Sequence, residues 1–141
     1  MNSFNHFALG AVGAWMFEYQ LGITSDHANG NAGYRHFILQ PMAGGNYESL
    51  EGSYDSNYGR ICSSWTADKG VMKSYTCSIP ANTSATVYIP VGEAVATALP
   101  ADGAEFKGFC EHLGHKAACY EVVSGKWEFT IGQTEVSVKV M

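Results

Sequence analysis

The sequence predicts a mainly β protein: an antiparallel β-sandwich preceded by one long amphipathic α-helix. Apolar residues recur at helical spacing up to residue 22 and at every second position from Tyr34 onward, and turn-forming residues interrupt the second pattern repeatedly. The chain has 141 residues, of which 46% are hydrophobic and only 15% are charged. A chain of this length and composition has enough apolar side chains for one domain with its own core, which excludes a disordered protein.

The helix is predicted over residues 1–22. Asn2 or Ser3 can cap its first turn, and Gly22 can end it in a left-handed conformation. A sandwich encloses its own core, so the apolar side of this helix must lie outside a sheet or against other helices of a larger domain. In the isolated chain the same side would favour self-association. Its members are Phe4, Phe7, Ala8, Ala11, Val12, Trp15, Met16 and Tyr19.

Residues 23–33 are predicted to be a linker and residues 34–141 the sandwich. The first strand is predicted over residues 34–41, where Phe37 and Leu39 alternate with His36 and Ile38. Further strands are predicted at 50–54, 61–65, 71–79, 85–89, 120–123, 127–131 and 136–140. Turns are predicted at 55–59, 68–70, 80–83 and 124–125, and residues 92–118 are predicted to be less regular.

Charge and hydropathy exclude two classes of partner. Eight Lys and Arg against thirteen Asp and Glu give a net charge of −5, which argues against binding to nucleic acid. The longest apolar run, residues 8–17, is too short to span a membrane, so no membrane partner is predicted. A signal peptide begins with basic residues, and the first positively charged side chain here is Arg35, so no signal peptide is expected in residues 1–34. The compartment stays open, with the periplasm or the extracellular space favoured over the cytoplasm.

Five segments carry a recognisable pattern, in this order: MNSFNHFALGAVG (1–13), YRHFILQP (34–41), SYDSNYGRI (53–61), IPANTSATVYIP (79–90) and SGKWEF (124–129). The first, followed by Trp15, resembles the last helix of the (α/α)₆ barrel of bacterial α-L-rhamnosidases, glycoside hydrolase family seventy-eight. The other four resemble the C-terminal β-sandwich of the same enzymes. The resemblance therefore implies a C-terminal region in which the predicted helix is a remnant of the catalytic barrel.

The resemblance also implies a reaction and the part this chain takes in it. Such enzymes remove terminal α-L-rhamnose with inversion, using one carboxyl group as the general acid and another to activate water. In the family both carboxyl groups precede the segment that begins this chain, so no catalytic residue is expected here and the chain alone should be inactive. His6 is expected to contact the sugar in the intact enzyme, since a neutral imidazole both donates and accepts hydrogen bonds. Rhamnosides would bind through the barrel, and no cofactor is implied.

A zinc site is the main alternative chemistry. Cys110, His112, His115 and Cys119 place two thiols and two imidazoles within ten residues, and zinc binds four such ligands tetrahedrally. The paired spacings usual in structural zinc sites are missing, so we predict no metal. The four cysteines, which also include Cys62 and Cys77, are instead predicted to be buried free thiols, and alternation puts Cys62 and Cys77 on opposite faces of a sheet.

The alternative function is a carbohydrate-binding sandwich without catalysis. Exposed tyrosine rings can stack on sugars, and four candidates are Tyr47, Tyr54, Tyr58 and Tyr88. Asp55 and Arg60 flank one tight turn and are predicted to stabilise that turn rather than to act in catalysis.

Overall fold

The computed structural model describes residues 21–25, 36–43, 47–56 and 58–141. Nine strands lie in these residues and form one continuous sheet. In chain order they are β1 (Ile23–Ser25), β2 (His36–Leu39), β3 (Ser49–Ser56), β4 (Gly59–Asp68), β5 (Val71–Pro90), β6 (Thr97–Ala98), β7 (Ala104–His112), β8 (His115–Ile131) and β9 (Glu135–Val140). The mainly β prediction is confirmed. Of the helix predicted over residues 1–22, only residues 21 and 22 are among those described, and His6 is not.

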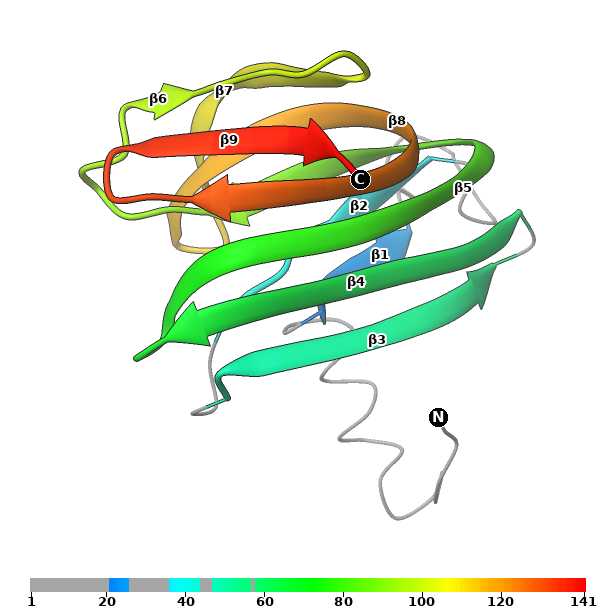
Figure 1. The fold of residues 1–141 in the computed structure, drawn as a ribbon, viewed down its shortest axis with the longest axis horizontal. Helices are drawn as coiled ribbons and strands as arrows, with labels where there is room; N and C mark the ends of the chain where they lie inside the picture. Colours follow the sequence, from blue (N-terminus) through cyan, green and yellow to red (C-terminus); the bar gives the residue numbers. More distant parts are fainter. Residues whose placement is uncertain (1–20, 26–35, 44–46, 57) are drawn as a thin grey trace.

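The sheet folds over into two layers because its two longest strands pass through both. The first half of β5 pairs with β4 and with the second half of β8, whereas its second half pairs with β2 and with the first half of β8. The first layer therefore runs β3-β4-β5-β8-β9-β6 and the second runs β1-β2-β5-β8-β7. Figure 1 shows both long strands curving from one layer into the other. The β2–β5 and β6–β9 pairs are parallel, so the sandwich is not purely antiparallel.

The predicted turns at 80–83 and 124–125 are bends inside continuous strands, and this prediction was wrong. β5 extends unbroken over 20 residues. Its register against β8 shifts between Ile79, opposite Gly125, and Ser84, opposite Val123. Four residues of β5 therefore face a single residue of β8, which is a bulge that bends both strands. Proline, asparagine and glycine signal a bulge and a turn alike, so the sequence did not separate the two.

The stretch predicted to be irregular, residues 92–118, contains β6, β7 and the start of β8. Its alternation is hidden by a second bulge, because the register of β7 against β8 shifts between Phe106 and Gly108. β1 lies in the segment predicted as a linker and pairs antiparallel with β2. The hairpin predicted at 68–70 is confirmed: Lys69 and Gly70 both have positive φ, the backbone that a tight two-residue turn requires.

The core lies between the two layers and is built from alternate residues of each strand. Phe37 and Leu39 are fully buried, and they alternate with His36 and Ile38, which are half-buried. Tyr120 of the second layer packs edge-on against Phe129 of the first, with ring centroids 5.1 Å apart, and Phe129 also contacts Tyr75 at 6.1 Å. In β9, Val136 and Val138 are buried but Val140 is 65% exposed, so the core ends before the strand does.

The chain enters the sandwich through a packed junction at residues 21–22. Leu21 is buried, and its carbonyl oxygen accepts a hydrogen bond of 2.8 Å from Ser63 Oγ, which also lies 2.8 Å from Tyr75 Oη. Gly22 has φ +73°, and a Cβ there would lie 2.2 Å from the carbonyl carbon of Gln40. A β-carbon at Gly52 would come within 2.5 Å of Leu21 Cδ1. Gly22 is therefore required for the junction to close, whereas a side chain at Gly52 would displace the end of the Leu21 side chain.

Candidate functional site

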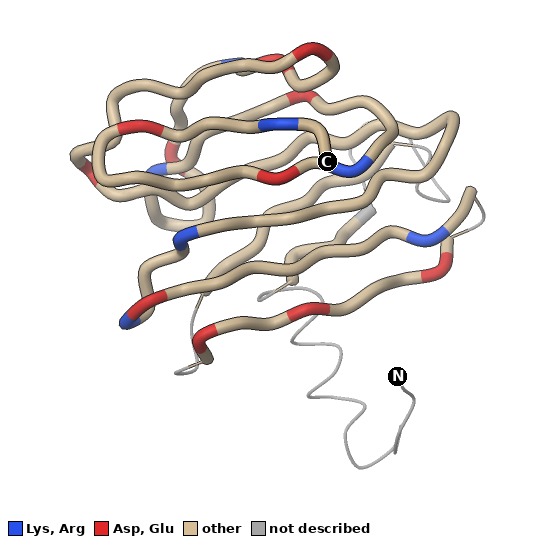
Figure 2. Tube along the Cα trace, viewed as in Figure 1, with Lys and Arg blue, Asp and Glu red and all other residues tan. Residues whose placement is uncertain are grey.

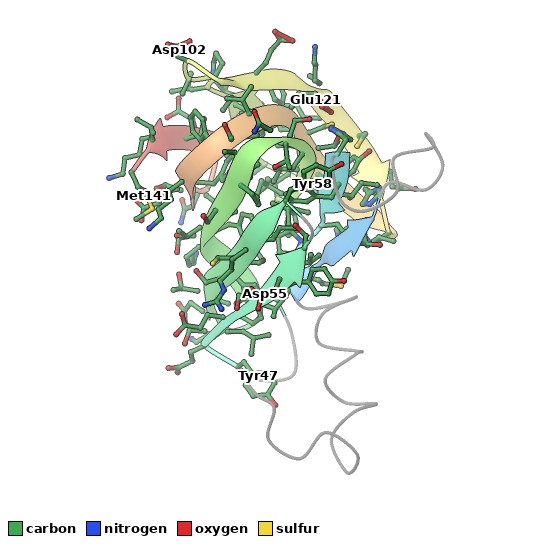
Figure 3. All side chains as sticks on the ribbon, turned by 90° about the vertical axis from the view of Figure 1, so that its right-hand side faces the viewer. Tyr47, Asp55, Tyr58, Asp102, Glu121 and Met141 are labelled. Atoms are coloured by element: carbon green, nitrogen blue, oxygen red, sulfur yellow. The ribbon has the colours of Figure 1, made fainter. Side chains whose placement is uncertain are left out.

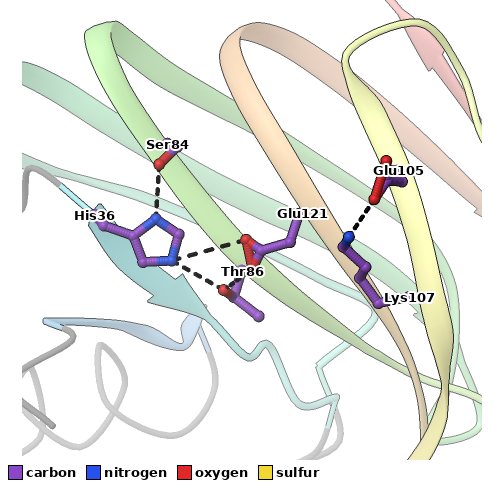
Figure 4. A network of polar contacts seen from close by, with 6 residues as sticks. All are labelled: His36, Ser84, Thr86, Glu105, Lys107 and Glu121. Atoms are coloured by element: carbon purple, nitrogen blue, oxygen red, sulfur yellow. Dashed lines mark hydrogen bonds and ion pairs between the residues drawn. The ribbon is translucent and has the colours of Figure 1, made fainter. Parts of the chain in front are cut away.

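A chain of hydrogen-bonded side chains crosses the outer face of the second layer (Figure 4). His36 Nδ1 lies 2.7 Å from Ser84 Oγ, and His36 Nε2 lies 3.0 Å from Thr86 Oγ1. The Thr86 hydroxyl donates in turn to the Glu121 carboxylate, which also lies 3.9 Å from His36 Nε2. Three strands supply these residues: β2, β5 and β8. Their outward positions follow from alternation with buried neighbours.

When His36 is neutral, the donors and acceptors of these three hydrogen bonds can be assigned in one way. Thr86 has a single hydroxyl hydrogen and donates it to Glu121, so the contact with His36 requires a hydrogen on Nε2. Nδ1 then accepts the hydrogen of Ser84. In the cluster of His36, Ser84, Thr86 and Glu121 each of these donors thus meets an acceptor, and the contacts tie β2 to β5 and β8.

A pocket of about 450 Å³ opens beside this cluster. Its walls include Ser84 and Glu121 from the cluster, together with Asp102, Glu105 and Val123. Glu105 lies opposite Glu121 across β7 and β8 and pairs with Lys107. The pocket is lined by three carboxylates and one hydroxyl, so it can accept hydrogen bonds from a ligand. Among the residues that the structure describes, the only buried polar or charged ones are Ser63 and Thr83, so no carboxyl group is buried.

The Cys-His segment forms the β7–β8 hairpin and does not gather its four side chains into one site. His112 lies opposite His115, whereas Cys110 lies opposite Ala117 and Cys119 opposite Gly108. The His112 ring stacks on Tyr88 with centroids 3.8 Å apart, and its Nε2 donates to Gln40 Oε1 at 2.7 Å. Burial, and then the neighbouring His115, lower the pKa of His112. Within the described ranges, no three His, Cys, Asp or Glu side chains are placed to hold a metal ion.

All four cysteines are free, but the prediction that they are buried holds in full only for Cys77. Cys62 and Cys119 are half-buried and Cys110 is exposed. Burial, and then the neighbouring Cys110, raise the pKa of Cys119 to about 11, so this thiol stays protonated at neutral pH. Cys62 and Cys77 point to opposite faces, because the partners across β4 and β5 are Cys62 with Ser78 and Ser63 with Cys77.

The tyrosines proposed to stack on sugars do not form one platform. Tyr47, Tyr54 and Tyr58 are each at least 40% exposed, but Tyr47 precedes β3 and Tyr58 follows it, at opposite ends of the strand (Figure 3). One face of the Tyr88 ring is covered by His112. The predicted turn pair is confirmed: Arg60 Nε donates to Asp55 Oδ1 at 2.9 Å across the β3–β4 hairpin, and both side chains are exposed.

Sequence reasoning missed the His36 cluster. The outward positions of Ser84 and Thr86 could be read from their alternation with Ala85 and Val87. The pairing that brings His36 beside them could not, because β2 and β5 are parallel strands joined through β3 and β4. The pocket beside Glu121 depends on β7, in the stretch predicted to be irregular. In the described part of the chain, no helix has the length and apolar character to cross a membrane.

Fold and surface together define a β-sandwich domain with no buried carboxyl group among its described residues. Residues 22–102 match the family of bacterial alpha-L-rhamnosidase C-terminal domains. The chain belongs to this family, and the resemblance of its sequence to that region is confirmed.

Two curated relatives and one solved structure give the extent of the likeness. An alpha-L-rhamnosidase of Streptomyces avermitilis is 36% identical over 131 residues, which cover 93% of this chain and 12% of the relative. One of Formosa agariphila is 36% identical over 90 residues, covering 64% of this chain and 9% of the relative. The crystal structure of the Streptomyces avermitilis enzyme complexed with L-rhamnose superposes with a TM-score of 0.64 at 34% identity, covering 94% of this chain and 12% of that one. The chain thus spans about a tenth of the length of these relatives.

Proposed function

We propose that this chain is the C-terminal part of an inverting α-L-rhamnosidase, which hydrolyses terminal α-L-rhamnose from glycosides. In this proposal the sandwich supports a preceding catalytic barrel, and the chain alone is inactive. The observation that carries it is the family match over residues 22–102, together with 36% identity to a named alpha-L-rhamnosidase across 93% of the chain.

The described carboxyl groups support the proposed inactivity. An inverting glycosidase needs a general acid whose pKa is raised, usually by burial, and a second carboxylate placed to hold water on the other side of the sugar. No carboxyl group is buried in the described part of the chain. Asp102, Glu105 and Glu121 share one pocket, but all three line an open surface rather than an enclosed site.

The junction at residues 21–22 supports a structural role for the sandwich. Leu21 accepts a hydrogen bond from Ser63 and packs closely against Gly52. The next residue, Gly22, accepts a backbone hydrogen bond of 3.0 Å from Gln40 N. These contacts fix the backbone of residues 21 and 22 at the start of the sandwich. We propose that this junction sets the position of residues 1–20 in the intact enzyme, including His6 as a contact to the sugar.

The test compares this chain with the full-length protein that contains it. We expect no release of 4-nitrophenol from 4-nitrophenyl α-L-rhamnopyranoside by residues 1–141 alone, and turnover by the full-length protein. Proton NMR of the first product should show the β-anomer, as inversion requires. In the full-length protein His6→Ala should raise KM more than it lowers kcat, and His6→Gln, which keeps a donor and an acceptor, should restore part of the loss.

Three results would overturn the proposal. Turnover by residues 1–141 would show that the chain contains its own acid and base. An α-anomer as first product would exclude inversion. A gene whose product begins at Met1, with no barrel upstream, would remove the parent enzyme altogether.

A further inference from the structure

A trough of about 500 Å³ lies on the outer face of the first layer, on the opposite side of the molecule from the His36 cluster. The outward side chains form rows across the strands. One row runs from Ser53 through Cys62 and Ser78 to Lys126, because each of these residues lies opposite the next. The neighbouring row runs Glu51, Ser64, Thr76 and Glu128. All of these except Glu128 line the trough.

The floor of the trough carries no charge. Figure 2 shows the middle of β4 and most of β5 without acidic or basic residues, and the only charged residue in the 20 of β5 is Lys73, near its start. Solvated sheet faces usually carry long charged side chains at such positions. In the middle of both central strands the outward residues are instead short: Cys62, Ser64, Thr66, Ser74, Thr76 and Ser78. Short side chains between longer neighbours leave the hollow.

The hydroxyl groups of this floor are available to a ligand. Ser64, Thr76 and Ser78 are half-buried. Within the described residues none of the three makes a side-chain hydrogen bond, whereas Thr66 and Ser74, just outside the lining, bond to one another at 2.7 Å. Hydroxyl groups both donate and accept by rotating. Three such groups therefore converge on one hollow without a protein partner.

Charged groups occur only at the rim, where Glu51, Arg60 and Lys126 line the trough. Arg60 is already paired with Asp55, which leaves one acidic side chain, on β3, and one basic side chain, on β8, at opposite edges of the trough. Because the two charges are opposite and equal in number, they do not favour a negatively or a positively charged ligand. Met141 is the only large apolar side chain in the lining.

From these observations we propose that the trough binds an extended, neutral oligosaccharide across strands β3, β4, β5 and β8. Rotatable hydroxyls match a ligand that presents donors and acceptors in alternation, and a floor of short side chains admits a chain of sugar rings laid flat. No aromatic ring lines the trough, so binding is expected to be weak, and affinity to grow with the length of the chain. The inference does not rest on the rhamnosidase assignment, since it uses only the described surface.

The test is titration of the ¹⁵N-labelled chain with three neutral probes: cellohexaose, maltohexaose and a rhamnan oligosaccharide. Amide shifts should move in β4 and the first half of β5 with at least one probe. Thr76→Val removes one hydroxyl at nearly constant shape and should weaken that binding about two- to tenfold, the value of one hydrogen bond. Ser78→Leu fills the trough and should abolish it.

Matched controls lie on the same outer face, outside the lining. Thr130→Val and Ser137→Leu repeat the two changes on β8 and β9 and should leave the shifts unaltered. Circular dichroism of all four variants checks that each is folded. The proposal is overturned if no probe moves the amides of β4 and β5, if the shifts map to Tyr47, Tyr58 or the pocket beside Glu121 instead, or if Thr76→Val binds like the unchanged chain. None of these outcomes bears on whether a full-length protein hydrolyses rhamnosides.

Discussion

The two outer faces of the sandwich differ in whether their central polar side chains form hydrogen bonds within the protein. On the second layer, His36, Ser84, Thr86 and Glu121 bond to one another, and His112 bonds to Gln40 while stacking on Tyr88. On the first layer, the central hydroxyls that line the trough have no protein partner among the described residues. The second face is therefore satisfied within the protein, and the first presents donors and acceptors to whatever lies against it.

One strand supplies both faces, so strand identity does not explain the difference. Thr76 and Thr86 both point outward from β5, one in each layer, and the four-residue bulge between Ile79 and Ser84 preserves the alternation. What differs is the neighbour across the sheet. Thr86 has Glu121 opposite it on β8 and His36 nearby on β2, whereas Thr76 lies between Ser64 and Glu128. Hydrogen bonding on each face thus depends on which strands the bends bring together.

The largest expected effect tests whether the two faces belong to one folding unit. Phe129→Ala removes the ring that contacts Tyr120 of the second layer and Tyr75 of the first. The cavity left in a fully buried site should lower the free energy of unfolding by about 3 to 5 kcal/mol. Urea denaturation followed by fluorescence and by circular dichroism should give one coincident transition. Val140→Ala, at a 65% exposed site, is the control and should change stability little. Two separate transitions would show that the layers fold independently.

The next largest effect tests the outer face of the second layer, where polar side chains form hydrogen bonds with one another. Thr86→Val removes the donor to Glu121 and the acceptor of His36 Nε2 while keeping the shape of the side chain. We expect a loss of about 1 to 2 kcal/mol in the free energy of unfolding, because two partly buried groups lose their partner. Urea denaturation measures it. Ser84→Ala, which removes only the bond to Nδ1, should cost less; equal stability of Thr86→Val and the unchanged chain would mean that the cluster contributes nothing to folding.

The sequence predicted those parts of this comparison that depend on local pattern. The period of two predicted the strand that contains Phe37 and Leu39, which are buried, and His36, which faces outward. It did not predict that β5 and β8 are continuous through both layers, because a bulge and a turn use the same residue types. Nor could it give the parallel pairing of β2 with β5, which depends on contacts between distant segments. The His36 cluster depends on both features and the trough on the pairing of β5 with β8, so neither could be predicted.

A smaller effect is the pH dependence of the free energy of unfolding that arises from His112, on the outer face of the second layer. Burial and His115 lower the pKa of His112 below its ordinary value of 6.5. The unfolded chain therefore binds more protons than the folded one between the two pKa values, so this contribution to stability is present above about pH 6.5 and is lost as the pH falls below it. His112→Phe keeps a ring for Tyr88 but does not titrate. Its unfolding free energy, measured by urea denaturation from about pH 7 down to pH 5, should fall less steeply than that of the unchanged chain. If the unfolding free energies of His112→Phe and of the unchanged chain fall equally steeply with pH, His112 is not the source of the pH dependence.

The smallest expected effect tests whether the Thr76 hydroxyl, on the outer face of the first layer, lacks a partner in the protein. Thr76→Val makes the same chemical change as Thr86→Val in the same strand, but no protein hydrogen bond is lost within the described structure. Valine also suits a half-buried strand position at least as well as threonine does. The free energy of unfolding should therefore change by less than about 0.5 kcal/mol, measured by urea denaturation beside Thr86→Val. If both substitutions cost the same, the hydroxyl of Thr76 already has a partner, and the first layer would be as self-satisfied as the second.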